Sequence, residues 1–142
     1  MINELPDPVL TQVYRCKSVL GPAVDVGEVR GGHRWVAPLV GGTFTGPELS
    51  GSLLPGGSAT WQVLPDGTAH AEARYTLRTD GGALLYVHLR GVGHGDPAKC
   101  PFHAATRIET AEPSLDWLNN GVLLTVVGCR AANLLYETYL VG

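Results

Sequence analysis

Residues 59–90 read ATWQVLPDGTAHAEARYTLRTDGGALLYVHLR, and this stretch decides the fold. Its runs of β-favouring residues are separated by Asp66-Gly67 and by Asp80-Gly81-Gly82. Asp-Gly and Gly-Gly between such runs are strong hairpin signals, because type I′ turns need a positive φ at both central residues. The stretch therefore predicts three antiparallel strands joined by two tight turns, the second at Asp80-Gly81 or Gly81-Gly82.

The length of each turn fixes which residues face each other. Two-residue turns would pair Pro65 with Thr68 and Thr79 with Gly82. This register predicts one face that mixes polar side chains of the middle strand with apolar side chains of its neighbours: His70, Glu72, Arg74 and Thr76 with Trp61, Val63, Leu85, Val87 and Leu89. A solvent face is normally polar on every strand and a core face apolar on every strand. The mixed face is therefore a candidate ligand or catalytic site.

Polar groups inside an apolar frame must be hydrogen-bonded or they destabilise the fold. We therefore predict that Glu72, Arg74 and His70 are catalytic, with Glu72 as a general base and Arg74 anchoring the substrate or stabilising an oxyanion. The predicted substrate-binding residues are Trp61, Thr76, Val87, Leu89, Trp117 and Asn119. Two alternatives stay open. Glu72 and Arg74 can form a solvated outward pair, and a three-residue loop with a bulge at either turn would flip a flanking strand.

Length and composition indicate one globular domain over residues 1–142, with 44% hydrophobic and 16% charged residues. The net charge of −3 and the scattered Lys and Arg residues give no footprint for nucleic acid. No stretch of about 18 apolar residues predicts a membrane span. The N-terminus does not resemble a signal peptide, and three cysteines without C-x-x-C spacing favour a reduced, cytoplasmic protein.

The rest of the chain predicts further short strands separated by Gly and Pro. The 19 glycines and 10 prolines suit turns rather than long helices. Only residues 112–121 favour a helical turn, which Ser114 caps and Asn120-Gly121 ends. About eight to nine short strands at intervals of 8–12 residues predict an all-β fold. We favour a single antiparallel barrel of the calycin or lipocalin kind, because closure removes exposed edges.

Several chemistries lack a sequence signal. The chain has no phosphate-binding loop, no G-x-S-x-G motif and no H-E-x-x-H motif. Its five histidines are dispersed, so we predict no metal site and no cofactor. Cys16, Cys100 and Cys129 read as small buried hydrophobes rather than nucleophiles.

Four motifs carry a family resemblance: residues 41–47 (GGTFTGP), 54–57 (LPGG) followed by Trp61-Gln62, 73–83 (ARYTLRTDGGA) and 117–119 (WLN). Together they resemble the DUF3237 (UPF0311) family, and the resemblance implies a small β-barrel. The chain departs from the family pattern at Thr60, where an acidic residue is usual, and at His103-Ala104, where Arg-Thr is usual. The segment between Gly91 and Phe102 is also short. These departures imply a specialised pocket, whereas Glu72 matches an acidic family position.

Three functions fit these observations. The first is a cofactor-free cyclase, isomerase or lyase that acts on a hydrophobic small molecule inside the barrel, such as a natural-product intermediate. Its rate would come from preorientation in an apolar cavity together with acid–base groups. The second is a small-molecule carrier, and the third a structural barrel with a filled interior. Partners are predicted to be a hydrophobic ligand and a second copy of the chain, docked through outer sheet faces or edge strands. The predicted register places Tyr75, Tyr86, His88 and Arg90 on the face opposite the candidate site, where they offer such a surface.

Overall fold

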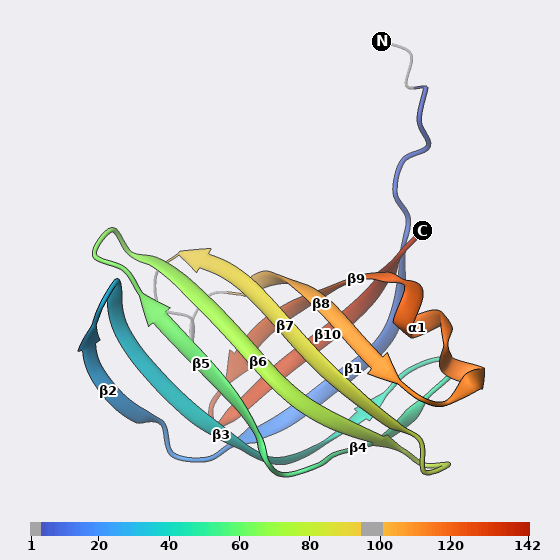
Figure 1. Ribbon diagram of the computed structural model, residues 1–142, viewed down its shortest axis with the longest axis horizontal. Helices are drawn as coiled ribbons and strands as arrows, with labels where there is room; N and C mark the ends of the chain where they lie inside the picture. The colour runs from blue at the N-terminus through green and yellow to red at the C-terminus, as the bar shows by residue number, and fades with distance from the viewer. Residues whose placement is uncertain (1–3, 95–100) are drawn as a thin grey trace.

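The computed structural model describes residues 4–94 and 101–142. Ten antiparallel strands account for most of these residues (Figure 1). The strands are β1 (Leu10–Leu20), β2 (Val24–Val29), β3 (Gly32–Thr45), β4 (Ser50–Leu53), β5 (Gly57–Val63), β6 (Thr68–Thr79), β7 (Leu84–His94), β8 (Phe102–Thr110), β9 (Val122–Arg130) and β10 (Asn133–Val141). A 3₁₀ turn (Pro113–Leu115) and the short helix α1 (Trp117–Asn120) lie between β8 and β9.

Eight strands form a closed barrel in the order β1, β10, β9, β8, β7, β6, β4 and β3. Pairing of β1 with the second half of β3 closes the ring, for example Cys16 with Phe44. The predicted all-β barrel is therefore confirmed. Residues 41–45 continue β3, because this half of the strand is paired on both sides, by β1 and by β4.

The other two strands extend one rim of the barrel. β2 and β5 pair with the first half of β3, on opposite sides of it. Together they form a three-stranded lip, which stands at the left in Figure 1. The opposite end carries α1, whose Leu118 is buried in the core. We call the end with the lip the barrel mouth.

Both turns of the central meander hold three residues, so the predicted register is wrong. Val63 pairs with Ala69, and Arg78 pairs with Leu84. The backbone bonds Leu64 N–H to Thr68 O and Thr79 N–H to Ala83 O, each 2.8 Å long, enclose the loops. Gly67 and Gly82 end these loops with φ of 87° and 94°, a geometry typical of three-residue hairpins that finish in a left-handed glycine.

Because each turn holds one residue more than predicted, the side chains of the middle strand exchange faces relative to those of both neighbouring strands. Ala69, Ala71, Ala73, Tyr75 and Leu77 of β6 are buried, whereas the alternate positions face outward. Leu85, Val87 and Leu89 of β7 are buried as predicted. The barrel interior is therefore apolar on all three strands. Among the described residues, no helix is long and apolar enough to cross a membrane.

Candidate functional site at the barrel mouth

The inner wall of the lip continues the inner wall of the barrel. Ala37 and Leu39 of β3 are buried in the core, so Trp35 and His33, two and four positions before Ala37, share their side of the strand. Trp35 pairs with Trp61 of β5, which pairs with Ala71 of β6. Side chains of the lip and of the interior therefore form one surface that runs from the rim into the barrel.

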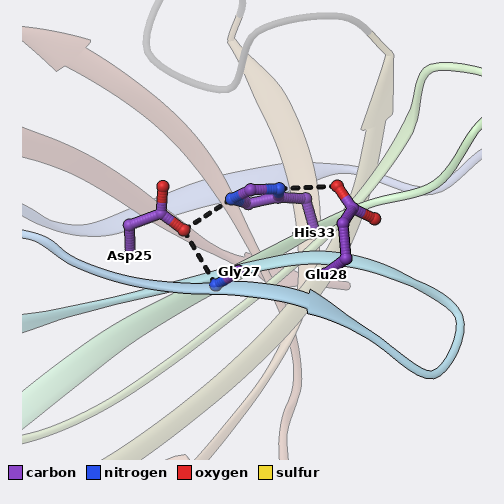
Figure 2. A network of polar contacts seen from close by, with 4 residues as sticks. All are labelled: Asp25, Gly27, Glu28 and His33. Atoms are coloured by element: carbon purple, nitrogen blue, oxygen red, sulfur yellow. Dashed lines mark hydrogen bonds and ion pairs between the residues drawn. The ribbon is translucent and has the colours of Figure 1, made fainter.

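His33 lies between two carboxyl groups on this surface (Figure 2). Its Nδ1 is 2.7 Å from Glu28 Oε1, and its Nε2 is 2.5 Å from Asp25 Oδ1. The Gly27 N–H donates to the same Asp25 oxygen at 2.8 Å. A histidine whose two ring nitrogens both donate to carboxylates carries two protons. The arrangement therefore favours the imidazolium form of His33 over the neutral ring.

The carboxylates shift the proton affinity of this imidazole. The hydrogen bond to Glu28, and then that to Asp25, raises the pKa of His33 above its ordinary value of 6.5. The ring also stacks on Trp35, with centroids 4.1 Å apart and an interplanar angle of 30°. His33 thus stacks on a tryptophan and contacts two carboxylates, which favour its charged form, and its side chain is 26% exposed. This combination suits a group that transfers a proton to a bound molecule.

This pKa shift gives a direct prediction. The His33 ring should titrate above 6.5 in the folded protein, and Glu28→Gln should lower its pKa, because Glu28 makes the largest contribution. Because the folded-state pKa is raised, the two ion pairs are complete below about pH 6.5 and are lost as the pH rises through the folded pKa. NMR titration of the ring protons measures both effects. Glu109→Gln, on the outer face of β8, is the control, and a wild-type His33 pKa at or below 6.5 would contradict the assignment.

Below the mouth, a small cavity lies inside the barrel. Its wall is mostly apolar and includes Trp61, Ala71, Leu89, Phe102 and Tyr136. Its volume of about 10 Å³ is close to the space that one water needs. Glu72 also borders the cavity, although its carboxylate lies on the outer surface. The cavity therefore has room for a larger molecule only if wall side chains such as the half-buried Trp61 move.

Hydroxyl groups are the polar groups of the interior. Tyr14 and Tyr75 share a hydrogen bond of 2.8 Å between their hydroxyls, and Tyr136 stacks on Tyr75 with centroids 5.0 Å apart. The Tyr136 hydroxyl is buried, and no described residue lies in good hydrogen-bonding geometry to it. It interacts weakly with the Ser18 hydroxyl, which lowers the pKa of Tyr136 against the effect of burial and itself donates to Leu134 O at 3.2 Å. A buried polar group with so poor a partner calls for an explanation, and a ligand is one.

Burial keeps these interior groups neutral. It raises the pKa of Tyr14, Tyr75 and Tyr136 far above neutral pH, so all three remain phenols. It also raises the pKa of the Cys16 thiol to about 12, so Cys16 is not a nucleophile at neutral pH. The interior can therefore donate hydrogen bonds, whereas charged acid–base groups stand at the mouth.

The predicted catalytic side chains lie on the outer face of β6. Glu72 Oε1 contacts His88 Nε2 at 2.6 Å and Arg74 Nη2 at 3.1 Å, with Glu72 38% and Arg74 57% exposed. The His88 hydrogen bond, opposed by partial burial and helped by Arg74, lowers the pKa of Glu72. His70 is exposed on the same side. Their predicted inward orientation is wrong because of the three-residue turns. Their catalytic role stays a prediction, now for a site outside the barrel.

The predicted substrate-binding residues are divided among three places. Trp61 and Leu89 line the cavity, and Val87 is buried in the core. Thr76 faces outward beside Tyr86. Trp117 lines a surface groove of about 380 Å³ at the opposite end. Asn119 binds the Thr110 backbone N–H and O, each at 2.8 Å, and so joins α1 to β8. The structure does not bring these six residues together.

Sequence reasoning missed His33, Asp25, Glu28, Trp35 and Tyr136. A signal for the first and fourth was present, because residues 33–39 alternate as His-x-Trp-x-Ala-x-Leu. Buried Ala37 and Leu39 place the whole alternating set on one face. No local pattern points to Asp25 and Glu28, because a bulge between Asp25 and Gly27 brings both to the same side of β2.

The fold and the site define a small antiparallel β-barrel with an apolar interior and an acid–base cluster at its mouth. Residues 8–100 match the family described as "Protein of unknown function (DUF3237)". The chain belongs to this family. A UPF0311 protein of Rhodopseudomonas palustris is 30% identical over 120 residues, which cover 75% of this chain and 78% of the relative.

Two further relatives bear on fold and function. A β-barrel-like protein from Acinetobacter baumannii superposes with a TM-score of 0.90 at 28% identity, covering 98% of this chain and 99% of that one. The hydroalkoxylation enzyme phnH of Penicillium herquei is 28% identical over 113 residues, which cover 80% of this chain and 70% of the enzyme.

Proposed function

We propose that this protein is a cofactor-free cyclase that acts on a hydrophobic small molecule, of the kind made in natural-product biosynthesis, bound at the barrel mouth. The observation that carries the proposal is the His33 ring held between Asp25 and Glu28 on the inner surface of the mouth. It stands next to tryptophan side chains and above an apolar cavity. The similarity to a hydroalkoxylation enzyme supports the same reaction class.

The proposed reaction is an intramolecular hydroalkoxylation, the addition of a hydroxyl group across a carbon–carbon double bond of the same molecule. The C–O bond forms, the π bond is consumed, and the hydroxyl proton is replaced by a C–H bond on the other alkene carbon. Substrate and product are isomers, so no oxidant or reductant is needed. A double bond conjugated to a carbonyl makes the attack favourable, because the carbonyl oxygen accepts the developing negative charge.

The mouth offers groups for both proton transfers. Glu28 takes the hydroxyl proton as the oxygen attacks, which weakens its hold on the His33 Nδ1–H, and His33 gives that Nδ1 proton to the carbon that becomes saturated. The 2.7 Å contact between Glu28 and His33 then returns the proton and restores both groups. Asp25, fixed by the Gly27 N–H, keeps the ring oriented. Such acid–base steps contribute about 10²–10⁴-fold each.

The wall of the site would supply orientation. Trp35 and Trp61 offer flat apolar surfaces for a ring system, and the Tyr136 hydroxyl offers a neutral hydrogen-bond donor to the substrate carbonyl. Holding the hydroxyl against the double bond converts a rare encounter into a unimolecular step. A barrel interior also excludes water, which would otherwise compete with the substrate hydroxyl for the base and for the double bond.

A panel of aromatic hydroxy-enones tests the proposal. Each compound carries a hydroxyl group and a conjugated double bond spaced to close a five- or six-membered ring. Chromatography with mass detection separates the isomers, and NMR identifies the cyclic ether. We expect enantiomerically enriched cyclic ether at a rate above that of the uncatalysed reaction. Binding of the panel without turnover would favour a carrier, and neither binding nor turnover would favour a structural barrel.

A further inference from the structure

The outer face of β9 and β10 is apolar, although it points away from the barrel. Alternate residues of both strands are buried, so the remaining residues face outward together. Val122 is 69% exposed, and Val122 pairs with Val141 and Leu124 with Tyr139 across the two strands. The outward apolar set comprises Val122, Leu124, Val126, Leu135, Tyr139 and Val141. We call it the β9–β10 face.

The other side of the same barrel behaves differently. The outward positions of β6, β7 and β8 are mostly polar or charged, and include His70, Glu72, Arg74, Arg90, Arg107 and Glu109. The exposed apolar residues on this side, Leu84, Tyr86 and Val92 of β7, each pair with a polar residue of β6, so they are not contiguous with one another across strands. A sheet face in contact with water is normally polar, as it is there. The contiguous apolar side chains of the β9–β10 face therefore indicate that this side is covered by another molecule.

Charges beside this face are arranged to match a copy of themselves. Arg15 of β1 contacts Glu137 of β10 at 3.2 Å, and both side chains are well exposed, at 67% and 40%. These two residues and Lys17 border a shallow hollow of about 210 Å³ with Leu135. A two-fold axis through such a surface places the cations of one copy against the carboxylate of the other. A surface with both signs side by side is thus self-complementary.

An exposed arm leaves the barrel beside this face. Val9 and Gly142 exchange two backbone hydrogen bonds of 2.8 Å, and residues 4–8 run on past the end of β10, away from the barrel (Figure 1). Leu5 and Val9 on this arm are 76% and 63% exposed. The arm also carries Glu4, which is opposite in charge to Arg15 and Lys17. The exposed apolar side chains of the arm and the Glu4 carboxylate fit the apolar and basic groups of a second copy.

We propose that the β9–β10 face, with Glu137 among its residues and Arg15 and Lys17 at its edge, docks a second copy of this chain in a two-fold symmetric dimer. Glu137 lies within the face, between Leu135 and Tyr139 on β10 and opposite Val126 on β9, whereas Arg15, Lys17 and the arms lie at its edge. Apolar residues surrounded by polar ones are usual in a protein interface. The proposal moves the interface away from Tyr75 and Tyr86, since Tyr75 is buried inside the barrel and Tyr86 stands among charged groups.

Sedimentation equilibrium of the full chain over about 1–100 μM tests this, a range that spans the dissociation of weak standard-size interfaces. We expect the wild type to approach twice the chain mass of 15.0 kDa. Val126→Lys should remain monomeric throughout, with the dissociation constant of the dimer raised at least about 100-fold, because a lysine at this apolar position would be desolvated in the interface. Glu137 lies opposite Val126 across the strands, so the new lysine finds a carboxylate and the monomer folds.

Tyr86→Lys is the matched control. It also replaces an outward apolar residue by lysine opposite a glutamate, Glu109, but on the other side of the barrel. We expect this variant to stay dimeric. Leu124→Gln serves as a second, milder disruption, and circular dichroism verifies that each variant is folded. A monomeric wild type at 100 μM, or a dimer broken by Tyr86→Lys and not by Val126→Lys, overturns the proposal.

Discussion

His33→Asn is expected to lower the kcat of hydroxy-enone cyclisation by about 10²–10⁴-fold, the share that one general acid–base group supplies. Asparagine keeps a hydrogen-bond donor near the two carboxylates but cannot give up a proton. Steady-state kinetics across pH 5–10 measure the effect. In the wild type, kcat should fall as the pH rises through the raised pKa of His33, because the proton donor is lost. That alkaline limb should be absent in the variant.

The chain contains a matched control for this experiment. His88 also contacts a carboxylate, Glu72, at 2.6 Å, but on the outer face of the barrel. We expect His88→Asn to retain kcat within about twofold, since no inner surface is touched. The competing hypothesis from sequence predicts instead that Glu72→Gln lowers kcat at least about tenfold. A His33→Asn enzyme with normal turnover, together with an impaired Glu72→Gln enzyme, would move the active site to the outer face.

Leu85→Ala is expected to lower the free energy of unfolding by about 2–5 kcal/mol. Leu85 is completely buried in the barrel core, so truncation loses its transfer free energy and leaves a cavity that close-packed neighbours cannot fill. Urea denaturation followed by tryptophan fluorescence measures the change. The denaturation slope should stay the same, because the amount of surface exposed on unfolding hardly changes.

Leu84 supplies the comparison on the same strand. It precedes Leu85, faces outward, and is 54% exposed. Leu84→Ala should change stability by no more than about 0.5 kcal/mol, as is usual for surface substitutions. The pair also tests the register of β7, because a slip of one residue would exchange the two roles. Equal losses for both variants would contradict the barrel described above.

The barrel could be predicted from the sequence, whereas the orientation of its middle strand could not. Asp66-Gly67 and Asp80-Gly81-Gly82 locate the turns, and the apolar alternation of β7 identifies its buried side. The same turn residues are compatible with a two-residue or a three-residue loop. A loop longer by one residue moves the Glu72 side chain from the inner to the outer face of the sheet. The backbone conformation of Gly67 and Gly82 decides between them, and it depends on how the whole sheet twists.

The candidate site was harder to predict because its parts come from separate strands. His33 and Trp35 lie on β3, Asp25 and Glu28 on β2, and Trp61 on β5. No spacing along the chain identifies such a group, since it depends on which strands pair with β3 and on the bulge in β2. The family resemblance supplied the barrel, but its motifs do not include His33 or Asp25. These residues come together only through the pairing of β2 and β5 with β3.

The pairing of β1 with β10 joins opposite ends of the described chain, from Leu10 with Val141 to Val19 with Asn133. Contacts between residues so far apart in sequence are expected to form late, because the entropy of closing a long loop is lost before the strands can form hydrogen bonds. Until then β1 and β10 each present a free edge, which can pair with another chain as readily as with its own. The last step of folding is therefore also the moment of greatest exposure to aggregation, and refolding yield should fall as protein concentration rises.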